Sequence, residues 1–144
     1  MTISFQSDNI SMPSINQAKI QQWIAAVARS YGFRVGAITY IFCNDDKIIQ
    51  VNRQFLQHDY YTDIITFDDT IGHTIQGDIY ISLDTVASNA EQQKTDYQEE
   101  LHRVIIHGIL HLCGINDKGP GERVIMEAAE NKALALFSNN LKVF

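Results

Sequence analysis

Residues 35–43 read VGAITYIFC, and this stretch decides the fold class. It is apolar on both faces and rich in β-branched and aromatic side chains, which is typical of a central strand covered on both sides. Before it, the apolar residues of 16–31 follow helical spacing, and Gly32 ends that helix. After it, Asn44 or Asp45 is suited to cap another helix. The stretch and its neighbours therefore predict strands that alternate with helices.

The same alternation continues along the rest of the chain. Further strands are expected around Ile3 and Phe5, over 64–67 and around Ile79 and Ile81, and further helices from Asp84, Asp96 and Pro120, the last with Ile125 on its buried face. The short connection between the last two strands indicates at least one antiparallel pair. We therefore expect an α/β fold in a single domain over 1–144. Its small, mixed, mostly parallel sheet should have about four strands packed with about five helices.

Composition and charge restrict the classes of protein to which the chain can belong. The chain has 144 residues, 45% of them hydrophobic, which is enough for one packed core. Its 11 Lys and Arg against 17 Asp and Glu leave a net charge of −6, so binding of RNA would need a local basic groove or a metal ion.

Targeting signals and cysteines bear on location. No signal-peptide pattern is present, and no apolar run approaches the roughly 20 residues of a membrane span. Cys43 and Cys113 lie in apolar stretches and predict buried, reduced thiols. We expect a soluble cytoplasmic protein without membrane contact.

The stretch most informative about function is 107–117, HGILHLCGIND. His107 and His111 are four residues apart, so on a helix they project from one face. Gly114 permits a left-handed residue that ends the helix, and the chain can then return Asp117 to the same place. Two imidazoles and a carboxylate bind one zinc ion and leave a site for water, as in catalytic zinc centres. We therefore predict one Zn²⁺ per chain, held by His107, His111 and Asp117.

Three segments, in the same order along the chain, resemble the YbeY endoribonuclease family. Residues 107–117 are similar to its signature, His-Gly-x-Leu-His-Leu-x-Gly followed by a third histidine ligand. Residues 62–67 (TDIITF) and 77–82 (GDIYIS) resemble its T-D-V-L-S-F and G-D-I-x-I-S segments, and Asn52 and Phe55 fit its N-x-x-[Y/F] pattern. Three ordered motifs over about residues 52–130 make coincidence an inadequate explanation.

The resemblance implies a mixed α/β fold with a metal-bearing cleft between helices and sheet. It also implies a metal-dependent endoribonuclease that cuts single-stranded RNA. Such an enzyme would mature ribosomal RNA, notably the 3′ end of the small-subunit RNA, and act in ribosome quality control. Its partners would be ribosomal RNA and ribosomal proteins or small-subunit assembly factors.

The chain departs from the family pattern at three positions. Asp117 stands in place of the third histidine, Asn116 in place of an aspartate, and Leu56 in place of a functional arginine. A carboxylate is a competent zinc ligand, although its negative charge makes the metal a weaker Lewis acid. With Leu56 in the arginine's place, Arg53 and His58 are the nearby candidates for a phosphate contact.

Two other functions fit parts of the pattern. Zinc metallopeptidases place three ligands at the same intervals, but they carry a glutamate base directly after the first histidine, where this chain has Gly108. Loss of such a base costs about 10²–10⁴ in rate, whereas RNA can be attacked by its own 2′-hydroxyl. The missing glutamate therefore favours RNA cleavage. A catalytically weak, ribosome-associated binding module would also keep the fold and the metal, with Leu56 marking the lost activity.

Overall fold

The computed structural model describes residues 1–57 and 62–139. Within these residues the chain forms four strands and five α-helices, which confirms the predicted α/β class, although strands and helices alternate only as far as β3. The strands are β1 (Thr2–Asp8), β2 (Arg34–Cys43), β3 (Ile64–Asp68) and β4 (Thr74–Ser82). The helices are α1 (Gln17–Ser30), α2 (Asp45–Val51), α3 (Leu83–Gln93), α4 (Tyr97–Leu112) and α5 (Glu122–Asn139), and a π-helical turn, η1 (Asn52–Leu56), continues α2.

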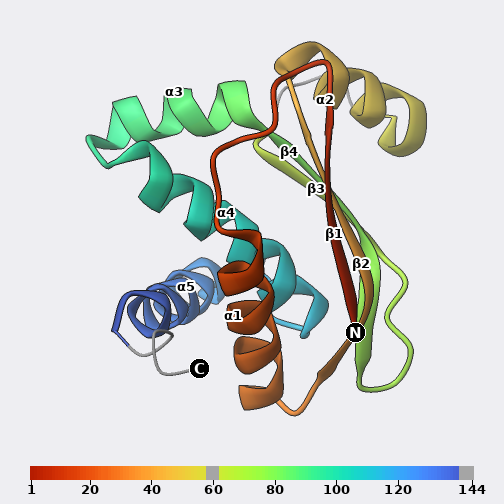
Figure 1. The fold of residues 1–144 in the computed structure, drawn as a ribbon, viewed down its shortest axis with the longest axis vertical. Helices are drawn as coiled ribbons and strands as arrows, with labels where there is room; N and C mark the ends of the chain where they lie inside the picture. Colours follow the sequence, from red (N-terminus) through yellow and green to blue (C-terminus); the bar gives the residue numbers. More distant parts are fainter. Residues whose placement is uncertain (58–61, 140–144) are drawn as a thin grey trace.

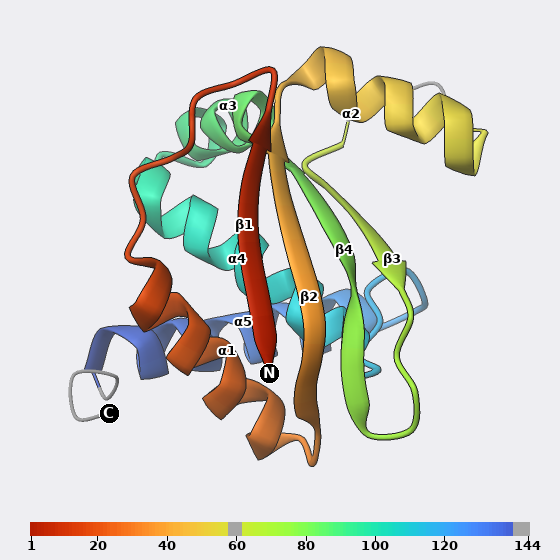
Figure 2. The same cartoon turned by 45° about the vertical axis from the view of Figure 1, so that its right-hand side comes forward.

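The four strands form one mixed sheet in the order β1-β2-β4-β3 (Figure 2). The β1–β2 and β2–β4 pairs are parallel, and β3 pairs with β4 in antiparallel orientation, as the short connection between them predicted. The edge position of β3 matters for function, because its N-terminal half borders the cleft described below.

The two faces of the sheet are covered unequally. Helices α1, α3, α4 and α5 lie on one side, and α2 lies apart from them at one end of the sheet (Figure 1). The side chains of Ile38, Tyr40 and Phe42 are buried on the face that packs against the helices, whereas Thr39 and Ile41 are only half-buried. The prediction that β2 is covered on both sides is therefore wrong for most of its length. In the part of the chain that the structure describes, no layer of helices covers the second face, because α2 reaches only one end of the sheet (Figure 1).

A small second core lies beneath α2. Cys43, Ile48, Val51 and Ile65 are buried together, and the half-buried rings of Phe67 and Tyr80 pack against them. This cluster joins α2 to the far face of β3 and β4. It is separate from the main core, which holds the side chains between the sheet and the other helices.

Most helix starts follow the predicted capping residues. Asn44 caps α2 by accepting a hydrogen bond from the Lys47 amide at 2.9 Å. Asp96 caps α4 by accepting one from the Glu99 amide at 3.3 Å. Helix α3 begins one residue before Asp84, because Ser82 is the cap.

The last helix differs from the prediction in its start and in its buried face. It begins at Glu122 rather than Pro120, because Gly121 adopts a φ of +76°, outside the helical region. Ile125 is 61% exposed, while Met126, Ala129 and Ala133 are buried. The buried face includes Glu130, a charged residue that apolar spacing assigns to the surface. The predicted face is therefore right at Ala129 and Ala133, which are buried, and wrong at Ile125 and Ala128, which are exposed.

Two further predictions concern cysteines and membranes. Cys43 and Cys113 are buried free thiols, as predicted. Among the helices of residues 1–57 and 62–139, none combines the length and apolar character needed to span a bilayer.

Candidate functional site

A cleft of about 610 Å³ opens between the sheet edge and the helices. One side, the helical wall, comes from the end of α3, the connection to α4, α4 itself, the turn after it and α5. The opposite side, the strand wall, comes from η1, residues 62–63 and β3. His107, His111 and Asp117 all line the helical wall, so the structure places the three predicted ligands in one cleft.

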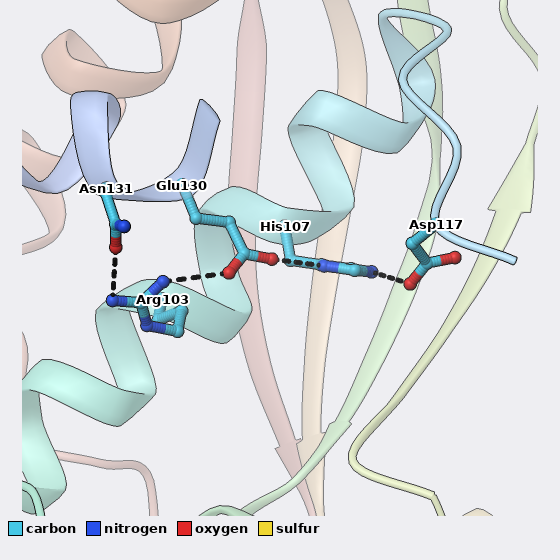
Figure 3. A network of polar contacts seen from close by, with 5 residues as sticks. All are labelled: Arg103, His107, Asp117, Glu130 and Asn131. Carbon is cyan, nitrogen blue, oxygen red and sulfur yellow. Dashed lines mark hydrogen bonds and ion pairs between the residues drawn. The ribbon is translucent and has the colours of Figure 1, made fainter. Parts of the chain in front are cut away.

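The end of α4 turns the chain back toward the histidines. Gly114 has a φ of +93°, and its amide bonds the His111 carbonyl at 3.0 Å. The Ile115 amide bonds the Leu110 carbonyl at 3.0 Å, which completes a Schellman motif. As a result Asp117 Oδ2 lies 3.4 Å from His107 Nε2 (Figure 3). The predicted left-handed stop at Gly114 is confirmed.

The other ring nitrogen of His107 is held by a carboxylate. His107 Nδ1 lies 2.7 Å from Glu130 Oε2 on α5. Arg103, one turn before His107, donates to Glu130 Oε1 at 2.9 Å and to Asn131 Oδ1 at 2.8 Å (Figure 3). The imidazole is therefore fixed between two carboxylates, those of Glu130 and Asp117.

The pKa values within this network move in opposite directions. Burial lowers the pKa of His107, but the hydrogen bond to Glu130 and the charges of Glu130, Asp117 and Asp63 outweigh it, so the net shift is upward. Burial raises the pKa of Glu130, but its hydrogen bonds to His107 and Arg103 outweigh that effect, so the net shift is downward. Both shifts favour an ionised Glu130 that accepts a hydrogen bond from the His107 ring.

Sequence reasoning missed Glu130 and Arg103. A signal existed for Arg103, since it precedes His107 by four residues and therefore shares its helix face. No such signal existed for Glu130, because 23 residues and a chain reversal separate it from His107.

The donor set can be tested for its fit to a metal ion. Two imidazoles and a carboxylate are suitable ligands, and a histidine whose second nitrogen is held by a carboxylate is typical of metal-binding histidines. Asp117 forms an ion pair with His107, while His111 lines the same cleft without a hydrogen bond or ion pair to either residue. Within residues 1–57 and 62–139, no group of three His, Cys, Asp or Glu side chains is already assembled around one point. The residues thus fit a metal by the chemistry of their donor atoms, and Asp117 is directed at Nε2 of His107.

The cleft is acidic rather than basic. Six carboxylates line its described part, against three Lys or Arg, which gives −3 when histidines are counted as neutral. They are Asp63, Glu99, Glu100, Asp117, Glu127 and Glu130, against Arg103, Lys118 and Arg123. Burial is the main cause that raises the pKa values of Asp63 and Glu100. The basic groove that RNA binding requires is therefore not built by these side chains alone.

The two predicted phosphate-binding residues do not join the described lining. Arg53 is exposed on η1, and the lining includes its neighbours Asn52 and Leu56 instead. His58 lies outside the described residues. Lys118 and Arg123, which the sequence did not single out, do line the cleft.

Gly108 is the point where the two walls meet. A Cβ atom at this position would lie 3.0 Å from Ile79 Cδ1 and 3.2 Å from Ile64 Cδ1. The backbone of α4 therefore packs directly on β3 and β4, and Gly108 is buried. The position where a metallopeptidase carries its glutamate faces the core in this chain, not the cleft.

Comparisons with known proteins agree with one another. The family model described as Endoribonuclease YbeY matches residues 2–138. The Endoribonuclease YbeY of Phocaeicola vulgatus is 69% identical, over 94% of this chain and 99% of that protein. The Endoribonuclease YbeY of Bacteroides fragilis is 65% identical, over 94% and 98%, and that of Porphyromonas gingivalis 50%, over 96% and 92%.

A solved structure supports the fold. The solution structure of TM1509 from Thermotoga maritima matches with a TM-score of 0.64 and 24% identity, over 98% of this chain and 95% of that one. At this identity the likeness speaks for the fold alone. The family match over nearly the whole chain and the high identities carry the assignment, and the chain belongs to the endoribonuclease YbeY family.

Proposed function

We propose that this protein is a zinc-dependent endoribonuclease that cuts single-stranded RNA in the maturation of ribosomal RNA, with His107, His111 and Asp117 as metal ligands. Membership of an endoribonuclease family supports cleavage of RNA phosphodiester bonds. Processing of the small-subunit RNA 3′ end and a part in ribosome quality control are the finer elements of the proposal. Ribosomal proteins or assembly factors would then be its partners, and the cytoplasm its location.

The observation that carries the proposal is the placement of His107 between two carboxylates. Glu130 holds Nδ1 at 2.7 Å, so Nε2 is the nitrogen directed into the cleft toward Asp117. A bound zinc ion would supply a Lewis acid beside the scissile phosphate and positive charge in a cleft that carries −3 without it. Glu130 would keep the ring in one orientation, and Arg103 would keep Glu130 in place.

Phosphate contacts are assigned to the cations of the helical wall. Arg103 is engaged by Glu130 and Asn131. Lys118 and Arg123 line the cleft and form no ion pair with another described residue. We therefore infer that these two side chains contact the phosphates of the RNA, ahead of Arg53, and that His58 stays a candidate from the sequence alone.

The experiment is cleavage of a labelled single-stranded RNA by the purified protein, with metal content measured on the same sample. We expect about one zinc per chain, cleavage that a chelator abolishes and zinc restores, and no cleavage of casein. His107→Ala and His111→Ala should lose both the zinc and the cleavage. His73→Ala is the matched control, because His73 is an exposed turn residue outside the cleft.

The outcomes separate the three functions. Cleavage of casein would support a metallopeptidase. Protein that is replete with zinc, binds ribosomal components and never cuts RNA would support the binding module. Full zinc retention by either histidine variant would contradict the proposed ligands.

A further inference from the structure

The cleft extends well beyond the proposed metal ligands. Its lining follows α4 from Glu99 to His111, which is about 18 Å at the rise of an α-helix. The ligands lie toward the C-terminal end of this length and in the turn after it. The opposite end, here called the amide end, is formed by Asn89 and Gln93 of α3 and by Thr95 in the connection to α4 (Figure 1). The cleft therefore has room for more of an RNA strand than the phosphate that is cut.

The two amides of this end share one face of α3. Asn89 and Gln93 are four residues apart on the helix, so their side chains project from the same side into the cleft. Val86 and Ala90 are buried and hold α3 in place. Within residues 1–57 and 62–139, neither side-chain amide forms a hydrogen bond with another residue. Both amides therefore keep their donors and acceptors open to a bound molecule.

Charge decides which part of an RNA strand this end can hold. Between the amide end and Arg103, the described lining carries Glu99 and Glu100 and no Lys or Arg. The Arg103 guanidinium is itself engaged by Glu130 and Asn131. Carboxylates repel the phosphates of RNA, so the backbone of the strand is disfavoured at this end.

An unpaired base fits the amide end better than a phosphate does. A base is uncharged, and its edge carries hydrogen-bond donors and acceptors side by side. A side-chain amide offers the same combination, which is why Asn and Gln can make two hydrogen bonds to one base. In single-stranded RNA these edges are free, and proteins that read RNA sequence bind them there.

We propose that Asn89 and Gln93 form a base-recognition subsite, which makes hydrogen bonds to the edge of one unpaired base near the cleavage position. This inference rests on the proposed nuclease function and adds a sequence preference to it. The ligands lie farther along the same cleft, so the recognised nucleotide lies on one fixed side of the bond that is cut.

The test is cleavage of a pool of single-stranded RNA with randomised sequence by the zinc-loaded protein, followed by sequencing of the new ends. The wild type should favour one base at one fixed position by about 5- to 150-fold, the discrimination that a bidentate contact between an amide and a base gives. The double variant Asn89→Ala, Gln93→Ala should lose the preference at that position and keep any preference elsewhere. Its zinc content should stay at about one per chain, because neither residue is a proposed ligand.

Binding gives a second measurement. A short fluorescein-labelled RNA with the favoured base should bind the wild type more tightly than the same RNA with that base removed. The double variant should bind both RNAs equally, because the contact is already lost. The dependence of affinity on salt should be the same in both proteins, since the amides neutralise no phosphate.

Gln92→Ala is the matched control. Gln92 is an exposed amide of the same helix that does not belong to the described lining, so its loss should leave the base preference unchanged. Melting curves of all variants establish that they are folded.

The outcomes distinguish this inference from the function on which it rests. If the wild type cuts RNA with a base preference that the double variant retains, the subsite is overturned and the nuclease function stands. A wild type that cuts RNA without any base preference overturns the subsite as well, and so does an equal loss of preference in Gln92→Ala. A wild type that cuts no RNA overturns both.

Discussion

The two walls of the cleft are built in opposite ways. On the helical wall, polar side chains are buried and interlocked: Glu130 is only 8% exposed and bonds both His107 and Arg103. On the strand wall, Leu56 is 41% exposed and apolar, and Asp63 is the only ionisable group among the described lining residues. Buried charges are stable only when paired, so a wall of paired charges holds its groups in one orientation. The difference teaches that the helical wall fixes the orientation of the proposed metal ligands. The strand wall instead contributes the shape of the cleft and an apolar surface that a bound molecule can contact.

The largest expected effect is on the helical wall, at its turn. Asp117 lines the cleft 3.4 Å from His107 Nε2, whereas Asn116 is exposed and outside the lining. Loss of a residue that only supports a metal ligand weakens metal affinity by at most about 100-fold. Asp117→Ala should weaken zinc affinity by more than that, because it removes a ligand itself. Asn116→Ala should change it little, and Asp117→His should restore binding. Zinc titration with a fluorescent chelator measures all three, and the reverse ranking of the two alanine variants would place the ligand one residue earlier.

Glu130 tests whether the helical wall acts by orientation. Glu130→Gln keeps the size of the side chain but removes the charge that holds His107 and Arg103. We expect zinc affinity to fall about 10- to 100-fold, as is usual for a carboxylate that supports a metal-binding histidine. Glu127→Gln is the matched control, since Glu127 is an exposed carboxylate of the same helix and the same cleft. Equal losses in both variants would mean that net charge, not orientation, is what Glu130 contributes.

Gly108 tests the junction between the walls. Because a Cβ atom there already meets Ile79 and Ile64 at 3.0 and 3.2 Å, Gly108→Leu should separate α4 from the sheet edge. The expected loss in the free energy of unfolding is about 1–3 kcal/mol, measured by urea denaturation. Ala128→Leu, at an exposed position of α5, should stay within about 0.5 kcal/mol of wild type. A stable Gly108→Leu variant would show that the two walls can move apart freely.

The smallest effect concerns Glu100, a helical-wall carboxyl that is 5% exposed. Burial raises its pKa above the ordinary value of 4.5, and the charges of Asp63 and Glu130 add to the rise. The folded protein then binds more protons than the unfolded chain above pH 4.5, so stability falls as the pH rises from there through the folded-state pKa. Glu100→Gln should therefore be more stable than wild type at neutral pH and flatten this dependence, by less than the Gly108→Leu effect. Urea unfolding of metal-free protein across this range measures it, and a variant less stable than wild type at neutral pH would contradict the sign.

Much of the fold followed from local patterns. Asn44 and Asp96 cap helices because a side-chain oxygen can reach an amide three residues later, which is a purely local contact. Gly114 ends α4 for an equally local reason, its positive φ. The predictions failed where a distant partner decides the outcome. Ile125 is exposed and Met126 is buried, because the packing of α5 brings Glu130 against His107 of α4.

The same division holds at the site. By itself the sequence determined that His107 and His111 share one helix face and that the chain reverses before Asp117, since helical periodicity and a left-handed glycine act within a few residues. Only the tertiary structure decided that Glu130 holds Nδ1 of His107, that Gly108 packs on Ile79 and that the far face of β2 lacks helices. Each of these joins residues more than 20 positions apart or depends on where a whole helix lies. Such contacts arise from the packing of helices and strands against one another. They cannot be inferred from the local backbone preferences that determine each helix or strand.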